Sequence, residues 1–397
     1  MRTIATITAS EMRAINRSAV LEVIRQYAPI SRVEIANRLG ISLPTVMRLV
    51  DDLLAEDLIC PSQTSLATGG RRGELLEFNA SGHLVVGVDL GGTKVHGAIA
   101  DLAGNILHEV NVTGHMTHGE DSYALLVKLL ENLSSIATSS GKHLLGLGVG
   151  VPGVVHPESG EVGLAPALNW NDFPLRPRLE RYFGLPVVVE NDVNLAALGE
   201  LWYGAGQDVN TLVLITVGTG IGAGVIVNGC LYAGAHFMAG EIGYLVPDRS
   251  FLGKPVDGFG ALEQLASGTG IAERARQKLT GRRPAEMIAS LTAEDVFEAA
   301  RAQELWAMEV VEETVDWLAQ AIAAIQLVVD PELILLGGGV SNSADLLIDP
   351  VLKRLEGVIP VQPVLIPSRL GYRAGVLGAV VKLLRVTANY YLLQKFS

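Results

Sequence analysis

Two segments of the chain repeat one unusual order: an apolar strand, a glycine-containing loop, and then directly a second strand. They span residues 84–100 and 212–227, with their loops at 89–94 and 217–224. A strand rather than a helix follows each loop, which excludes the Walker A loop and the dinucleotide-binding fingerprint. We interpret the repeat as two related lobes of an α/β fold that close on a nucleotide.

The loops carry groups that suit phosphates. Their glycines let backbone N–H groups approach phosphate oxygens, while a threonine hydroxyl and Asp89 suit a hydrated Mg²⁺. A third glycine cluster, at 337–339, follows an apolar run. One such loop is also explained by a tight turn, but three at strand ends favour a nucleotide site. The candidate nucleotide-binding residues are Asp89, Gly91, Gly92, Thr93, Lys94, Gly218, Thr219, Gly220, Gly337 and Gly338.

Between the two repeats, an apolar strand runs into Asn191 and Asp192 and then into a helix that reaches Tyr203. At this strand end, Asp192 can accept the proton of a sugar hydroxyl that attacks a γ-phosphate, and Asn191 can fix the same sugar. Phosphoryl transfer needs mainly such positioning and charge neutralisation. The alternative interpretation is that both residues cap the helix, and the two interpretations are compatible.

The N-terminal part of the chain predicts a DNA-binding unit. Apolar spacing predicts a helix over 11–27, and a capping box at 31–34 begins a second helix that ends at a glycine. A third helix is capped by Ser42 and places Thr45 and Arg48 away from its apolar stripe. Two short helices separated by a glycine turn are typical of helix-turn-helix domains, so these three residues are candidate DNA contacts.

A wing follows these helices. Strands are expected at 58–60 and 75–78, joined by a loop whose glycines let Arg71 and Arg72 reach a phosphate or the minor groove. Residues 1–79 hold nine Arg, no Lys and nine acidic residues, whereas the net charge of the whole chain is −12. A neutral segment with arginines can contact DNA, while the acidic remainder of the chain is repelled by the DNA phosphates. A plain three-helix subdomain with a solvated arginine pair is the alternative.

These motifs resemble the ROK family of repressors, open reading frames and kinases, and its repressor branch in particular. The similarity is carried by the loops at 89–94 and 217–224, the run 190–194, the Ala-Gly-Glu-Ile-Gly motif at 239–243 and Leu-Glu at 262–263. It extends to Gly-Val-Leu-Gly-Ala at 375–379, so it covers nearly the whole chain.

The resemblance implies an N-terminal winged helix-turn-helix, residues 1–80, followed by a ROK sugar-kinase-like domain, residues 81–397. The latter would have the two-lobed actin-like, ribonuclease H-like ATPase fold, with lobes of about 81–200 and 201–397. The sugar contacts that the resemblance implies are Asn191, Asp192, Glu241 and Glu263, with Asp192 as the catalytic base.

Departures from the family pattern concern the sugar and a metal. Tyr244 stands where the family has a histidine, and we count it among the sugar contacts. That histidine joins three cysteines in a structural zinc site of the family, but residues 252–262 contain no cysteine. Because such zinc needs four ligands, we expect no structural zinc and no other metal centre. Ala167 also stands where the family has a sugar-contacting asparagine, which favours a ligand other than glucose or N-acetylglucosamine; the alternative is that Asn169 takes this role through a shift of the loop.

The expected function is that of a sugar-responsive repressor, with operator DNA and a monosaccharide effector as partners. An ATP-dependent sugar kinase, by itself or combined with regulation, is the alternative, because the retained loops allow Mg-ATP to bind. Inactivation by a protein partner is a third mode that the sequence does not select. Helix-turn-helix repressors bind two half-sites, which predicts a homodimer or homotetramer. Two cysteines and no apolar run long enough for a membrane span predict a cytoplasmic protein without membrane insertion.

Overall fold

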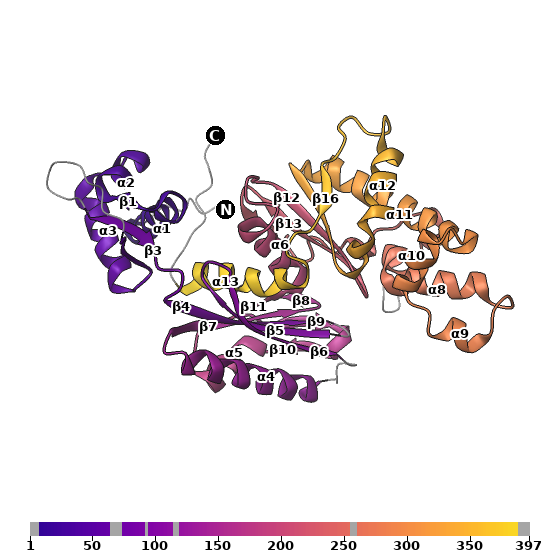
Figure 1. The fold of residues 1–397 in the computed structure, drawn as a ribbon, viewed down its shortest axis with the longest axis horizontal. Helices are drawn as coiled ribbons and strands as arrows, with labels where there is room; N and C mark the ends of the chain where they lie inside the picture. Colours follow the sequence, from indigo (N-terminus) through magenta and orange to yellow (C-terminus); the bar gives the residue numbers. More distant parts are fainter. Residues whose placement is uncertain (1–7, 64–73, 92–93, 114–118, 255–259, 388–397) are drawn as a thin grey trace.

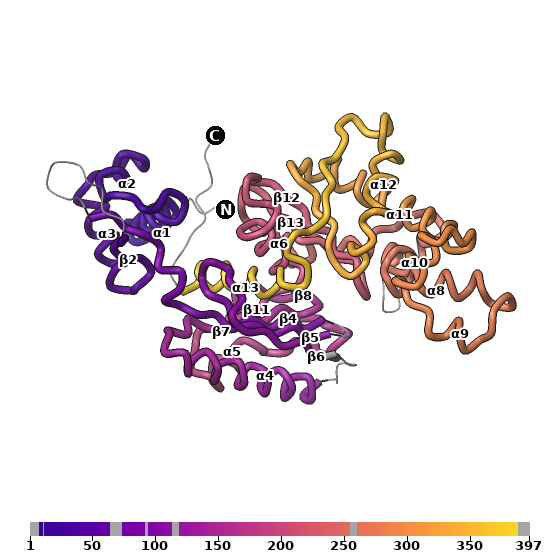
Figure 2. The backbone as a smooth tube through the Cα atoms, in the orientation of Figure 1, coloured from indigo at the N-terminus to yellow at the C-terminus, as the bar shows by residue number. Residues whose placement is uncertain are grey.

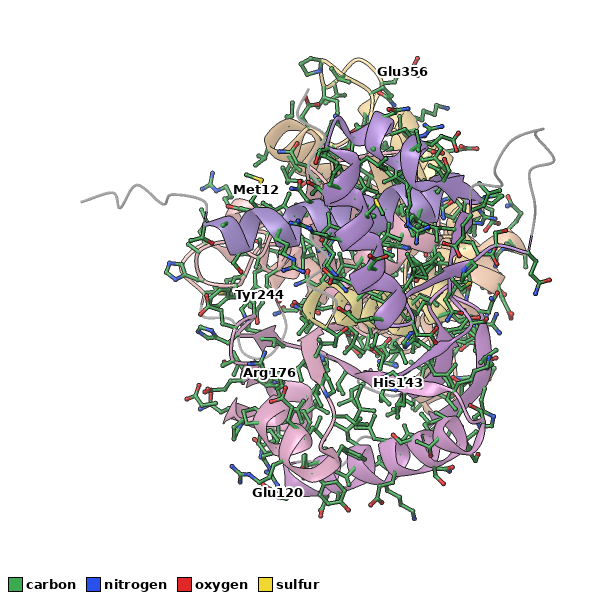
Figure 3. The ribbon with its side chains drawn as sticks, turned by 90° about the vertical axis from the view of Figure 1, so that its left-hand side faces the viewer. Met12, Glu120, His143, Arg176, Tyr244 and Glu356 are labelled. Atoms are coloured by element: carbon green, nitrogen blue, oxygen red, sulfur yellow. The ribbon has the colours of Figure 1, made fainter. Side chains whose placement is uncertain are left out.

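The computed structural model describes residues 8–63, 74–91, 94–113, 119–254 and 260–387. They form three parts: a small N-terminal domain, a first lobe beside it and a second lobe farther away (Figure 1). Figure 3 views the molecule from the side of the N-terminal domain, with Met12 labelled on its first helix. Among the described residues, none of the helices has the length and apolar character that crossing a membrane requires.

The N-terminal domain consists of three helices and a three-stranded antiparallel sheet in the order β1-β3-β2. Its apolar core includes the stripe of the third helix, Val46, Leu49, Val50 and Leu53, all of which are buried. The elements are α1 (Ala9–Tyr27), β1 (Ile30–Ser31), α2 (Arg32–Leu39), α3 (Leu43–Ala55), β2 (Ile59–Pro61) and β3 (Leu75–Phe78).

The predicted caps of this domain are confirmed. The hydroxyl of Ser31 accepts a hydrogen bond from the Glu34 amide at 3.2 Å, and the Glu34 carboxylate accepts one from the Ser31 amide at 3.3 Å. Gly40 ends α2 at a φ of 65°, a left-handed conformation that favours glycine. Ser42 caps α3 through the amide of Thr45.

The first lobe is a five-stranded sheet in the order β11-β7-β4-β5-β6. Helices α4 and α5 cover one face, and α6 and α13 cover the other (Figure 1). The elements are β4 (His83–Leu90), β5 (Lys94–Asp101), β6 (Ile106–Thr113), α4 (Glu120–Ser139), β7 (His143–Val151), α5 (Leu175–Phe183), β11 (Val187–Asn191), α6 (Asp192–Tyr203) and α13 (Ala374–Thr387). A small side sheet has β8 (Val154–Val155), β9 (Val162–Ala165) and β10 (Trp170–Phe173), with a 3₁₀ turn at η1 (Pro166–Leu168).

The second lobe has a five-stranded sheet with the same arrangement, in the order β14-β13-β12-β15-β16. In each lobe three parallel strands are extended by two antiparallel ones, β5 and β6 in the first lobe and β13 and β14 in the second. The buried face of α11 and its neighbouring helices form the largest apolar core of the lobe. Its strands are β12 (Leu212–Val217), β13 (Ile221–Val227), β14 (Cys230–Leu231), β15 (Leu333–Gly337) and β16 (Leu365–Pro367). Its helices are η2 (Ile242–Tyr244), η3 (Arg249–Phe251), α7 (Ala261–Ala266), α8 (Gly268–Leu279), α9 (Ala285–Ala289), α10 (Ala293–Arg301), α11 (Leu305–Val329), η4 (Gly339–Leu346) and α12 (Ile348–Leu355). The short η5 (Gly371–Arg373) follows the return of the chain to the first lobe, where Arg373 pairs with Glu109 of β6.

One strand differs from the sequence prediction, which placed the second strand of the second repeat at 225–227. Strand β13 begins at Ile221 and includes two of the glycines assigned to the loop. These glycines are there because the strand lies directly against α6. A Cβ atom on Gly224 would be 2.5 Å from the Cβ of Ala197, and one on Gly222 would be 3.1 Å from Cγ2 of Val193.

The chain passes between the lobes twice, after α6 and again before α13 (Figure 2). Its last described helix, α13, packs on the first sheet, because Gly87 and Gly148 leave room for Val376 and Ala379. Helices α6 and α13 also pack so closely that their backbones are in contact. A Cβ atom on Gly378 would be 1.7 Å from the carbonyl oxygen of Leu195.

Candidate functional site

Asn191 and Asp192 lie where β11 ends and α6 begins, at the carboxyl edge of the first sheet. The Asn191 side chain caps the helix: Oδ1 accepts from the Asn194 amide at 3.0 Å, and Nδ2 donates to the Gly153 carbonyl at 3.1 Å. The Asp192 carboxylate accepts from the amide of Val193 at 2.9 Å. The capping interpretation is therefore correct, and it does not exclude the sugar role. An amide nitrogen has a second N–H, and each side-chain oxygen has a further lone pair.

Asp89 lies near the end of β4, which β7 separates from β11, and it comes close to the start of α6. A Cβ atom on Gly150 would be 3.3 Å from both Oδ1 of Asp89 and Cα of Asp192. Burial raises the pKa of Asp89 to about 6. Its buried Oδ1 has no hydrogen-bond partner within the described residues. An unpartnered buried carboxylate oxygen fits a cation, and Mg²⁺ is typically held by one or two carboxylates and substrate phosphates.

Burial raises the pKa of Asp192 well above its usual range, and the neighbouring carboxyls of Asp89 and Glu241 raise it further. The contribution of Glu241 links the two lobes electrostatically, because Glu241 precedes η2 in the second lobe. A carboxyl with a raised pKa holds a proton more readily than an exposed one, which suits a group that accepts a proton from an alcohol.

The second lobe adds Glu263 and Tyr244 to this cluster. Glu263 accepts from the amides of Ile221 at 2.9 Å and Gly260 at 3.1 Å, so its carboxylate is fixed against the β12–β13 loop. Burial raises the pKa of Glu263. The pKa of Glu241 is raised mainly by burial and also by the charge of Glu263. Tyr244 is 44% exposed, and the pKa of its hydroxyl is raised by burial and by Glu241 and Glu263. The charge of Glu263 thus acts on Glu241, and that of Glu241 acts on Asp192 of the first lobe.

The predicted phosphate loops are partly described. Gly91 closes a turn by donating to the carbonyl of Lys94 at 2.9 Å, and Lys94 is exposed. Gly92 and Thr93 lie outside the described residues. In the second lobe, Gly338 has a φ of 82° and passes so close to Val217 that a Cβ atom would be 2.4 Å from its carbonyl oxygen. The glycines that end β15 therefore lie directly beside the end of β12.

The start of α8 touches the loop between β12 and β13, and this contact was not predicted from the sequence. The amide of Gly268 donates to the carbonyl of Gly218 at 2.7 Å, and the hydroxyl of Thr269 donates to the carbonyl of Thr219 at 2.7 Å. Ser267 caps the helix through the amide of Gly270. The run Ser-Gly-Thr-Gly before a helical segment is the signal that could have found it.

The candidate DNA contacts lie on and before α3. Ser42 and Arg48 are exposed and Thr45 is half-buried, while Arg71 and Arg72 lie outside the described residues. Other arginines of the domain are engaged in ion pairs: Arg13 with Asp52, Arg17 with Glu56, Arg25 with Glu22, and Arg32 with Glu74. Arg48 forms no ion pair with any described residue, so its guanidinium is available to a ligand.

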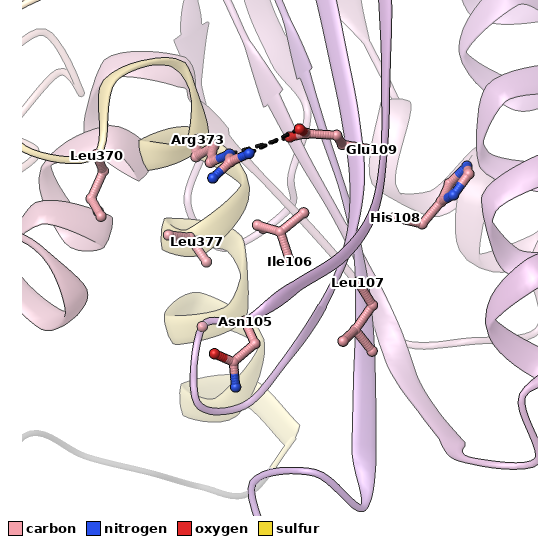
Figure 4. A pocket seen from close by; sticks show the side chains of 9 residues that line it. Asn105, Ile106, Leu107, His108, Glu109, Leu370, Arg373 and Leu377 are labelled. Atoms are coloured by element: carbon pink, nitrogen blue, oxygen red, sulfur yellow. Dashed lines mark hydrogen bonds and ion pairs between the residues drawn. The ribbon is translucent and has the colours of Figure 1, made fainter.

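Two hollows in the described structure lie elsewhere. A groove of about 580 Å³ runs between β6 and α13, where Arg373 pairs with Glu109 at 2.9 Å (Figure 4). A cavity of about 200 Å³ lies beside Glu190 and Lys382. Neither is lined by a predicted site residue.

The expectation that the chain binds no structural zinc can be tested by measuring the metal content of the protein. Among the described residues, no three His, Cys, Asp or Glu side chains lie close enough to hold a metal together. Elemental analysis of purified protein washed with a chelator is expected to give much less than one zinc per chain. A stoichiometric zinc signal would contradict the expectation that the chain binds no structural zinc.

Comparison with known proteins matches both parts. The ROK family model matches residues 85–385, and a model described as winged helix-turn-helix DNA-binding matches 14–59. The xylose repressor of Caldicellulosiruptor bescii is 31% identical over 356 residues, covering 88% of each chain. The glucokinase of Halalkalibacterium halodurans is 38% identical over 285 residues, covering 68% of this chain and 84% of its own. A crystal structure of a ROK family transcriptional regulator, described as a homologue of the E. coli MLC protein, has a TM-score of 0.82. It is 25% identical and covers 96% of this chain and 98% of its own.

Proposed function

The chain belongs to the ROK family and is a sugar-responsive DNA-binding repressor, and we propose that its effector is a monosaccharide bound between the two lobes. The observation that carries the proposal is that the start of α6 lies against β13, which also holds the residue before Glu241. A Cβ atom on Gly222 would be 3.1 Å from Cγ2 of Val193, and the amide of Ala223 donates to the carbonyl of Gly240 at 2.7 Å. In keeping with this placement, the charge of Glu241 raises the pKa of Asp192. Carboxylates accept hydrogen bonds from sugar hydroxyls, so a sugar that binds both would draw the lobes together. The proposed contacts are Asn191, Asp192, Glu241, Tyr244 and Glu263.

The proposed division is a DNA-binding domain at residues 1–80 and a sugar-binding domain at 81–397, with lobes of about 81–200 and 201–397. In the DNA-binding domain, α3 would enter the major groove with Ser42, Thr45 and Arg48 towards the bases, and the wing would bring Arg71 and Arg72 to the backbone. A homodimer or homotetramer would present two such domains at the spacing of two half-sites.

The buried Asp89 and the glycine loops beside it support Mg-ATP as a second ligand of the same site. Asp89, with its unpartnered buried oxygen, would hold the hydrated Mg²⁺ of a bound nucleotide. Residues Gly91–Lys94, Gly218–Gly220 and Gly337–Gly338 would surround the phosphates. The bound metal would neutralise charge on the phosphates. Asp192 would then take the proton of the attacking hydroxyl. The similarity to a glucokinase supports this activity as an addition to regulation.

The proposal is tested by sugar-dependent release of DNA. An operator duplex selected from random sequences by the purified protein would be titrated by fluorescence anisotropy against D-xylose, D-glucose and N-acetylglucosamine, with and without Mg-ATP. We expect one sugar to weaken operator binding about 5–150-fold without ATP, the usual range of allosteric coupling. Rapid phosphorylation of a sugar that leaves operator binding unchanged would instead assign the chain to the kinases.

A further inference from the structure

Helix α6 lies between the two five-stranded sheets, one from each lobe. It contacts β7 and β11 of the first lobe and β12 and β13 of the second. Leu195, Leu198 and Leu201 of α6 share one apolar cluster with residues of the second sheet. The helix begins at Asp192, directly after its cap Asn191, and ends at Tyr203, so its 12 residues extend about 18 Å from the proposed sugar contacts.

The last turn of α6 carries a carboxylate that ties together both connections between the lobes. Glu200 is completely buried. Its Oε2 accepts from the amide of Ala205 at 3.0 Å, in the segment that leaves the first lobe. Its Oε1 accepts from the Ser368 hydroxyl at 2.6 Å and from the Leu370 amide at 2.7 Å, in the segment that returns. Three hydrogen bonds to one buried carboxyl therefore join the end of α6 to both segments that connect the lobes.

The same turn of α6 also reaches the DNA-binding domain. Trp202 is 5% exposed and belongs to the apolar cluster that contains Val20 and Ile24 of α1. The Arg25 guanidinium lies over the Trp202 ring, 4.6 Å from its centre. Two hydrogen bonds to the Glu22 carboxylate, at 3.0 and 2.8 Å, hold that guanidinium in place. Trp202 therefore meets a rigidly held group of α1.

The neighbouring Tyr203 makes a second connection. Its hydroxyl donates to the carbonyl of Leu102 at 2.9 Å, and the amide of Leu102 donates to the carbonyl of Ala80 at 3.0 Å. Ala80 lies between the last strand of the DNA-binding domain and the first strand of the first lobe. The end of α6 is thus joined to this domain through both α1 and the linker.

We propose that α6 transmits sugar binding to the DNA-binding domain, with Glu200 positioning the hinge and Trp202 acting on Arg25. The inference rests on the proposed sugar site at the start of this helix. When the second lobe closes on a sugar, it moves against α6 about the two connections that Glu200 holds. Because the helix is rigid, its last turn shifts α1 and changes the spacing of paired domains on the operator.

Two variants test the link without touching the sugar contacts or α3. Arg25→Met keeps the aliphatic stem but removes the cation, and Trp202→Phe keeps an aromatic ring of smaller size. The control is Arg178→Met, because Arg178 also lies over an aromatic ring, Tyr123 at 3.9 Å, and pairs with a carboxylate, Glu120 at 2.7 Å. It belongs to α5, which covers the opposite face of the first sheet from α6. Thermal unfolding would show that each variant folds.

The measured quantity is the ratio of operator Kd with saturating sugar to operator Kd without it, using D-xylose and D-glucose as probes. We expect both variants to lower this ratio about fivefold or more while sugar Kd, measured by calorimetry, stays within about twofold. The control should keep the wild-type ratio. Glu200→Gln should lower the same ratio of operator Kd values. In this variant the amides of Ala205 and Leu370 should also exchange hydrogen faster than in the wild type.

Distinct results separate this inference from the proposed function. If wild-type protein binds sugar and releases operator, but both variants retain the full ratio, the role of α6 is overturned and the sugar-responsive function stands. If neither sugar binds the wild-type protein or changes its operator affinity, the proposed site and the inference built on it both fail.

Discussion

Asp192→Asn is expected to lower sugar-dependent ATP turnover by about 10²–10⁴-fold, the usual contribution of a general base, while sugar affinity stays nearly intact. Asparagine has the same shape and can still accept the hydrogen bond of the Val193 amide, so α6 should begin normally. It cannot take up the proton of an attacking hydroxyl. Because wild-type turnover is itself expected to be slow, the measurement needs a sensitive assay of ADP release at saturating sugar.

The control for this prediction is Asp248→Asn. Asp248 also caps a short helix, through the amide of Ser250, but it lies outside the proposed contacts. That variant should turn over ATP like the wild type. If Asp192→Asn weakens sugar binding only modestly and leaves turnover unchanged, Asp192 anchors the sugar without acting as a base. In either case, sugar should still release the operator without ATP.

Replacing both wing arginines, Arg71 and Arg72, with alanine is expected to weaken binding to every DNA duplex. Each phosphate contact contributes about 0.9 to the slope of log K against log salt, so the slope should fall by about 2. Arg48→Ala should instead relax the preference at one base position, by about 1–3 kcal/mol, because a guanidinium that reads a base edge is lost. Fluorescence titration at several salt concentrations, with operator variants, measures both effects.

A suitable control for the arginine variants is Arg13→Ala. Arg13 is also an exposed cation of the DNA-binding domain, but it is paired with Asp52 at 2.7 Å. Its loss should leave the salt slope within experimental error of the wild type. If the triple variant of Arg48, Arg71 and Arg72 binds the operator as tightly as wild type, the DNA-binding surface lies elsewhere on the domain.

The sequence predicted best what depends on neighbours along the chain. The caps at Ser31 and Ser42 were predicted correctly, because a cap is formed by residues three positions apart. The strands that precede the glycine loops were also predicted, since buried strands are short apolar runs. The family and the order of its two parts followed from motifs of this local kind, and the comparisons confirm them.

What the sequence could not predict depends on contacts between distant segments. The glycines of β13 looked like part of a loop because nothing nearby in the sequence shows that Ala197 of α6 lies against them. Likewise, Glu200 looks like an ordinary helical residue until the fold brings Ser368 and Leu370 to its carboxylate. The two-residue strand β1 is too short to give a pattern of its own and forms only by pairing with β3.

The position of α13 has a consequence for synthesis on the ribosome. The first sheet includes residues 83–191, yet α13, which covers its central strands, is translated nearly two hundred residues later. Until α13 emerges, the face around Gly87 and Gly148 lacks its covering helix, and α6 lacks its neighbour. The DNA-binding domain, by contrast, is translated first, and domains generally fold as units during synthesis. A nascent chain can therefore acquire its DNA-binding domain well before it acquires the lobe that is to control it.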